Sequence, residues 1–212
     1  MKMSQRSTRV RLMRRGHVAG VAGATLLLVT SAASCGRSHK GPVAVLGDSI
    51  TALSNDTLHA TLDGHYTISV IGKFGARTDE ALDEATLLAR ADPEQAIINL
   101  GTNDAIQDVP AERTGANLDK LVATFRGATC IGLVTIDEQM TAFGVSHRAS
   151  AAAVNAQIRR IADAVDTVSV IDWTQLVAGH GGVAAMTTDG VHPNPTGMQV
   201  LADAYLDALN DC

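Results

Sequence analysis

Short runs of aliphatic and β-branched residues alternate with longer amphipathic segments over most of this 212-residue chain. Continuous apolar runs are typical of parallel strands covered on both faces, and their alternation with helices is typical of βαβ units. The predicted strands are Val43–Leu46, Thr67–Ile71, Ala96–Leu100, Cys130–Ile136 and Val168–Ile171. The predicted helices are Thr78–Ala91, Ala111–Arg126, His147–Val165 and Pro195–Leu209. The alternation therefore predicts an α/β fold built on a parallel sheet.

Polar and glycine-containing segments follow three of the predicted strands and precede the last helix. They are GDS (47–49), GKFGART (72–78), GTND (101–104) and TTDGVHPNP (187–195). In an open parallel sheet, ligands bind beyond the carboxyl ends of the strands. We therefore expect these four segments, which are far apart in the sequence, to meet at one edge of the sheet.

Ser49 follows the first strand directly, and it is either a helix cap or a nucleophile. A serine hydroxyl becomes a good nucleophile only when a nearby base removes its proton. Histidine suits that role near neutral pH, and a carboxylate on its other ring nitrogen holds the imidazole in place. Asp189 and His192 supply both groups within four residues. The sequence thus predicts a triad of Ser49, His192 and Asp189.

Hydrolysis of an ester also requires hydrogen-bond donors for the negatively charged oxygen of the intermediate. Three candidates lie in the same segments: the backbone N–H of Ser49, the backbone N–H of Gly75 and the side-chain amide of Asn103. Asp48 and Asp104 are interpreted as turn, loop or cap residues. Lys73 and Arg77 are interpreted either as partners of an anionic substrate group or as solvated loop charges.

Together, these segments resemble the conserved blocks of the SGNH hydrolases, also called the GDSL esterase/lipase family. GDSI resembles the first block, GTND the third and DGVHP the fifth, and the match covers nearly all of 43–209. The resemblance implies a three-layer α/β/α sandwich with five parallel strands, and Ser-His-Asp ester hydrolysis without metal or cofactor. The second block departs from the family, which often has Asn where this chain has Val70. Gly72 is therefore the alternative to Gly75 as the oxyanion glycine.

The first 35 residues have the pattern of an export signal. They contain six of the 17 Lys and Arg residues, no Asp or Glu, and the apolar segment Val18–Val29. That segment is shorter than the roughly 20 residues of a membrane-spanning helix, and small residues follow it. We predict a signal peptide over 1–35 and an extracellular or cell-envelope location. Cys35 is either lipidated, as in bacterial lipoproteins, or remains unmodified after plain cleavage behind Ala33 or Ser34.

A polar tether (36–42) then leads to a predicted hydrolase domain over 43–212. The two cysteines of that domain, Cys130 and Cys212, form a disulfide if the compartment is oxidising, and the alternative is two unpaired thiols. Outside the leader, 11 basic residues face 22 acidic ones. Such a balance provides no basic face for nucleic acid.

The sequence thus predicts an exported, monomeric serine esterase for small or short-chain acyl esters. Its substrate would be a small-molecule or carbohydrate ester, and its membrane contact would be limited to a lipid anchor at Cys35. The other histidines lack the spacing of metal ligands, so no metal site is predicted. Two alternatives remain: an acyltransferase that uses the same triad, and a non-catalytic envelope binding protein with this fold.

Overall fold

The computed structural model describes residues 40–212. The predictions for the signal peptide, for Cys35 and for residues 36–39 of the tether fall outside the described residues. None of the helices within 40–212 has the length and apolar character that a membrane span requires.

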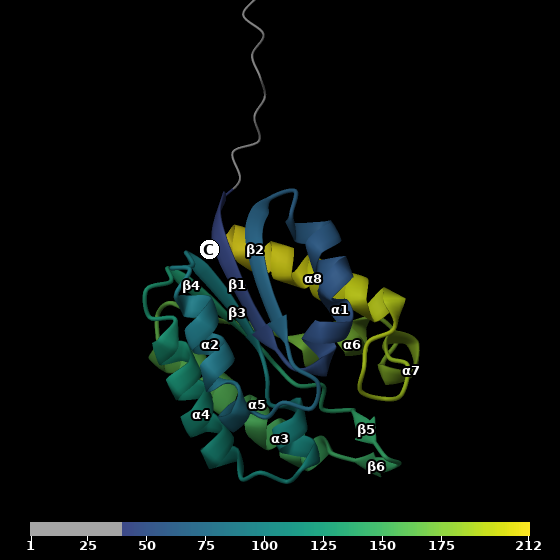
Figure 1. Cartoon of the computed structure of the whole chain (residues 1–212). Coiled ribbons are helices and arrows are strands. Elements are labelled where there is room, and N and C mark those ends of the chain that lie inside the picture. Colours follow the sequence, from purple (N-terminus) through teal and green to yellow (C-terminus); the bar gives the residue numbers. More distant parts are fainter. Residues whose placement is uncertain (1–39) are drawn as a thin grey trace, which may run out of the picture. The chain divides into compact units, whose positions relative to one another are not determined.

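Five parallel strands form one sheet in the order β2-β1-β3-β4-β7. Figure 1 labels β1, β2, β3 and β4 of this sheet. The strands are β1 (Lys40–Gly47), β2 (Tyr66–Gly72), β3 (Gln95–Asn99), β4 (Cys130–Val134) and β7 (Val168–Ile171). The five predicted strands and the parallel sheet are therefore confirmed. The predicted tether is wrong in its last three residues, which belong to β1. The backbone N–H of Lys40 donates to His65 O, and this bond extends the pairing of β1 with β2.

Helices cover both faces of the sheet and complete the three layers that the resemblance implies. They are α1 (Ser49–Leu62), α2 (Leu82–Ala89), α3 (Thr102–Ile106), α4 (Ala111–Thr124), α5 (Arg148–Ala164), α6 (Trp173–Gly179), α7 (Val183–Met186) and α8 (Pro195–Asp211). Val43 and Val45 of β1 point into the core under α1, α6 and α8. Ala44 and Leu46 point into the core under α2, α4 and α5. This alternation buries residues 43–47 of β1 on both faces, as expected for a sheet between two helical layers.

Two local features differ from the predicted elements. The predicted helix 78–91 is split into a 3₁₀ turn, η1 (Thr78–Glu80), and α2, because η1 is held by bonds to another segment that are described below. Between β4 and α5, a small antiparallel hairpin is formed by β5 (Thr141–Ala142) and β6 (Val145–Ser146). This hairpin is not among the elements that the sequence predicts.

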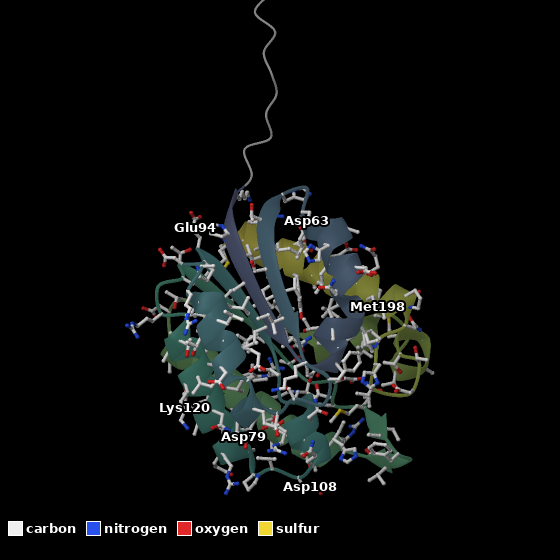
Figure 2. The ribbon with its side chains drawn as sticks, viewed as in Figure 1. Asp63, Asp79, Glu94, Asp108, Lys120 and Met198 are labelled. Atoms are coloured by element: carbon white, nitrogen blue, oxygen red, sulfur yellow. A yellow bond between two sulfur atoms is a disulfide. The ribbon has the colours of Figure 1, made fainter. Side chains whose placement is uncertain are left out.

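The two ends of the sheet carry different parts of the chain. Asp63 and Glu94 lie at the end where the strands begin, whereas Asp79 and Asp108 lie beyond the end where the strands finish (Figure 2). The hairpin β5–β6 and α3 also lie at the carboxyl end (Figure 1). This edge is where the predicted site residues should gather.

Candidate active site

Ser49 lies at the junction between β1 and α1. It is the first residue of α1, and only 7% of its surface is exposed. The cap of the helix is not Ser49 but Asp48, whose Oδ1 accepts the N–H of Ile50 at 2.9 Å. The turn is tight, because a Cβ on Gly47 would overlap the side chain of Thr51. The hydroxyl of Ser49 is therefore not used for capping.

Ser49, His192 and Asp189 form a continuous chain of hydrogen bonds. The Oγ of Ser49 lies 2.9 Å from Nε2 of His192, and Nδ1 of His192 lies 2.7 Å from Oδ2 of Asp189. The loop that brings His192 back over Asp189 turns at Gly190, whose φ of +89° is unfavourable for residues with a Cβ. The structure thus brings together the three residues that the sequence predicts as a triad.

The carboxylate of Asp189 is fixed by more than the imidazole. Its Oδ1 accepts the backbone N–H of His192 at 2.8 Å and that of Val191 at 3.0 Å. Burial alone would raise the pKa of Asp189, but the hydrogen bonds from His192 and Val191 outweigh burial and hold this pKa below its ordinary value. Asp189 therefore stays ionised, which is the state that orients and stabilises a histidine base.

The three predicted oxyanion donors are found in different environments. The N–H of Ser49 is at the first position of α1, where backbone N–H groups have no partner within the helix. Nδ2 of Asn103 donates to Ala76 O at 3.0 Å and to Oδ2 of Asp48 at 3.4 Å. The second contact is long for a hydrogen bond, so an incoming oxygen can compete for that donor.

Gly75 and Gly72, the two candidates for the oxyanion glycine, have different structural reasons to be glycine. Gly75 occupies a turn closed by the N–H of Ala76 on Lys73 O, and its φ is +74°. Among residues 40–212, no hydrogen bond uses its N–H. Gly72 ends β2, and a Cβ there would lie 2.3 Å from the backbone of Ala52 in α1. Close packing of the strand on the helix thus explains Gly72, which leaves Gly75 as the better donor candidate.

Asp48 is fully buried beneath the site. Burial raises its pKa to about 7, although the N–H of Ile50 and the charge of His192 act in the opposite direction. Its Oδ2 is the oxygen that contacts Asn103. Asp48 therefore joins the helix cap to one of the candidate oxyanion donors.

Asp104 has a larger structural role than its interpretation as a loop or cap residue suggests. It is fully buried and accepts bonds from the N–H of Thr78 at 2.9 Å, the hydroxyl of Thr78 at 2.6 Å and the hydroxyl of Thr114 at 3.2 Å. These bonds tie η1 and α4 to the segment that carries Asn103. The GTND motif is the only signal in the sequence that could have drawn attention to Asp104.

A cavity of about 400 Å³ opens above the triad. It is lined by Ser49, Thr102, Asn103, Ile106, Gln107, Ala142, Phe143, Asp189, Val191 and His192. Two of these residues, Ala142 and Phe143, come from the β5–β6 hairpin and are not predicted as site residues. The cavity is well within the size range of small-molecule sites.

The cations near the second block are already paired with acidic residues. Nζ of Lys73 lies 3.0 Å from Glu84, and the guanidinium of Arg77 contacts Asp79 at 3.0 Å and Glu80 at 3.2 Å. These pairs favour their interpretation as loop charges rather than as substrate contacts. Within residues 40–212, no three His, Cys, Asp or Glu side chains gather in a way that could hold a metal ion.

The two cysteines of the domain lie at the opposite end of the sheet, where the strands begin. Cys130 begins β4, Cys212 ends the chain behind α8, and the two are joined by a disulfide with their Cα atoms 5.9 Å apart. That separation is typical of disulfides. The bond closes the C-terminus onto the sheet far from Ser49.

Comparison with known proteins points to one family. A family model described as GDSL-like lipase/acylhydrolase matches residues 45–200. No curated protein sequence matches the chain significantly.

Several solved structures share the fold at low sequence identity. A GDSL-like lipase from Bacteroides thetaiotaomicron is 19% identical, covers 80% of this chain and 88% of its own, and has a TM-score of 0.70. The catalytic domain of a peptidoglycan O-acetyltransferase from Streptococcus pneumoniae is 22% identical, with coverages of 80% and 93% and a TM-score of 0.65. A catalytic mutant of an acetylxylan esterase from Geobacillus stearothermophilus is 19% identical, with coverages of 81% and 94% and a TM-score of 0.63.

These structures share the α/β/α architecture of the chain, and the family model spans most of its length, including the segments that carry Ser49 and His192. The chain therefore belongs to the GDSL-like lipase/acylhydrolase family.

Proposed function

We propose that this protein is an exported serine esterase that hydrolyses small or short-chain acyl esters. The observation that carries the proposal is the unbroken chain from Ser49 Oγ through His192 to Asp189, with distances of 2.9 and 2.7 Å, at the base of an open cavity. A binding protein has no need of this arrangement, so the contacts favour an enzyme over the non-catalytic alternative.

In the proposed reaction, Ser49 Oγ attacks the ester carbonyl carbon while its proton moves to Nε2 of His192. The C–O bond to the alcohol then breaks, and His192 returns the proton to the departing alcohol. This leaves an acyl group on Ser49. Water, deprotonated by the same imidazole, attacks the acyl carbon and releases the acid and free Ser49.

Asp189 keeps the imidazole in the required orientation and stabilises its charged form. The developing oxyanion would be bound by the N–H groups of Ser49 and Gly75 and by the amide of Asn103. Removal of one such donor typically lowers the rate by about 10²- to 10³-fold.

An acyltransferase that uses the same triad is the second candidate. It is favoured by the fold shared with a structure named as a peptidoglycan O-acetyltransferase, whereas another such structure is named as an acetylxylan esterase. Both names concern acetyl groups on polysaccharides, which supports a carbohydrate ester as the natural substrate. The two reactions differ only in whether water or another hydroxyl attacks the acyl enzyme.

Export is part of the same proposal. The basic and apolar leader over residues 1–35 supports it. The disulfide between Cys130 and Cys212 supports it independently, because such bonds persist in oxidising compartments.

Hydrolysis of p-nitrophenyl acetate tests the proposal. We expect turnover by the wild type and a loss of about 10³-fold or more in Ser49→Ala and His192→Ala. His65→Ala is a matched control, because His65 is exposed on the loop before β2 at the other edge of the sheet. If Ser49→Ala, shown to be folded by circular dichroism, kept the wild-type rate, the proposal would be wrong. Addition of a sugar acceptor and detection of its acylated product would identify the transferase.

A further inference from the structure

The hairpin beside the site has an unusual residue at its tip. The turn between β5 and β6 is formed by Phe143 and Gly144, with φ values of +52° and +77°. Two-residue hairpin turns with two positive φ values favour Asn or Asp followed by Gly. A bulky residue in this region of φ is a genuine outlier. Phe143 is therefore less favourable here than the small polar residues that such turns usually contain.

Phe143 also places an apolar ring in water, because 96% of its surface is exposed. Neither its backbone nor its side chain stabilises the fold in this position. Backbone strain of this kind persists mainly at functional positions, where it serves binding or catalysis. The residue thus needs an explanation outside folding.

The ring borders the cavity above the triad. Phe143 and Ala142 line this cavity together with Ile106 and Val191, which add further apolar walls. The only carboxylate in the lining is that of Asp189, which is paired with His192. The cavity therefore offers an uncharged group an apolar surface within reach of the nucleophile.

The hairpin is attached to the catalytic loop. The N–H of Thr141 donates to Gly190 O at 3.1 Å, between the two residues that form the Asp-His pair. At its base, the N–H of His147 donates to Met140 O at 3.3 Å. Phe143 is thus held in a defined position relative to His192.

The distribution of aromatic residues separates Phe143 from the others. The chain has three Phe, two Tyr and one Trp. Four of these six are buried, and Phe74 and Phe143 are exposed. Phe74 belongs to the turn that contains Gly75 and does not line the cavity. It is therefore an internal control for the effect of an exposed ring near the site.

We propose that Phe143 is a specificity residue that packs against an alkyl group of the substrate and favours esters with a longer apolar chain over those with a one- or two-carbon group at the same position. This inference rests on the proposed esterase function. The alkyl group belongs either to the acyl part or to the alcohol part of the ester. An alkyl chain in either part presents the same kind of apolar surface to the ring of Phe143. A water molecule takes up roughly 30 Å³ in the liquid. A cavity of about 400 Å³ therefore has room for many groups of that size, and so for more than an acetyl group.

Phe143→Asn tests the inference, because Asn suits the turn and removes the ring. One set of assays varies the acyl chain from acetate to hexanoate with p-nitrophenol as the alcohol, and the other varies the alcohol from methyl to hexyl with acetate. We expect the ratio of kcat/KM for the longer to the shorter ester to fall by about tenfold in one set, mainly through KM. The set that responds identifies the part of the ester that contacts Phe143.

Phe74→Ala should leave both ratios unchanged, and the melting temperature of Phe143→Asn should equal or exceed that of the wild type. The inference is overturned if Phe143→Asn keeps the wild-type ratios, or if it loses activity equally on all esters. In the first case, persisting hydrolysis of p-nitrophenyl acetate leaves the esterase proposal intact. Absence of hydrolysis by the wild type would instead overturn the proposed function itself.

Discussion

At the scale of single residues, the junction of β1 and α1 divides two roles between neighbouring side chains. Asp48 caps the helix through Ile50 N–H, and so the hydroxyl of Ser49 remains directed to His192. The cap has an energetic cost, because the carboxylate of Asp48 is buried completely and its burial outweighs the hydrogen bonds and charges that favour its ionised form. That cost depends on pH, since the neutral form of Asp48 is easier to bury than the charged form.

This cost predicts a pH dependence of stability. Between the unfolded pKa of 3.8 and the folded pKa of about 7, the folded state holds a proton on Asp48 that the unfolded state has lost. The free energy of unfolding therefore falls as the pH rises through this window, by about 2–3 kcal/mol for this group between pH 5 and 7.5.

Asp48→Asn removes the titration and keeps a side chain that can cap the helix. Urea unfolding at pH 5 and pH 7.5 measures the effect, and the variant should gain stability relative to the wild type at the higher pH. A difference in the free energy of unfolding between the variant and the wild type that is the same at both pH values does not bear on this prediction. If the free energy of unfolding changed equally between pH 5 and pH 7.5 in both proteins, the burial penalty assigned to Asp48 would be contradicted.

At the scale of elements, the loop with Asp189 and His192 depends on the hairpin next to it. Gly190 lies where the backbone of β5 passes, and a Cβ on it would be 2.5 Å from Thr141 O. The positive φ of Gly190 adds a second reason for glycine. The geometry of the triad is thus set partly by an element that contains none of its residues.

Gly190→Ala should therefore disturb the triad from outside it. We expect a loss of about 1–3 kcal/mol in the free energy of unfolding and a fall of at least tenfold in kcat for p-nitrophenyl acetate. Gly179→Ala is the matched control, because a Cβ at the end of α6 meets nothing within 4 Å. The control should have the stability and the activity of the wild type or slightly more stability. Full activity of Gly190→Ala would show that β5 does not position His192.

At the scale of the whole molecule, the two ends of the strands have different roles. The candidate site occupies the carboxyl edge, while the disulfide between Cys130 and Cys212 joins β4 and α8 at the amino edge. A bond between cysteines that are 82 positions apart in the sequence removes much of the entropy of the unfolded chain. Stability and chemistry are therefore expected to respond independently to its loss.

A double variant, Cys130→Ser with Cys212→Ser, tests this separation. In the chain-entropy model, the free energy of unfolding should fall by about 4 to 5 kcal/mol, while kcat at 25 °C stays near the wild-type value as long as the variant is folded. The wild type in reductant should behave like the variant, and the variant should not respond to reductant. A large loss of kcat in the folded variant would mean that the two edges are coupled.

Much of this protein is predictable from its sequence because the responsible signals are local. Alternating apolar runs determine the strands and helices through periodicity, and the parallel arrangement brings GDS, GTND and DGVH to one edge. The pairing of Asp189 with His192 is also local, since the two residues are three positions apart in the sequence. These features can be predicted without knowing which segments pack together.

Only the tertiary structure decided the remaining features, because they depend on contacts between segments that are distant in the sequence. The sequence around Asp104 predicts a turn residue. In the folded chain, Asp104 instead accepts hydrogen bonds from the hydroxyls of Thr78 and Thr114. The position of Phe143 at the cavity depends on the hairpin being docked on Gly190. Local patterns state what a segment prefers to be, whereas the packing of the whole chain sets which side chains it meets.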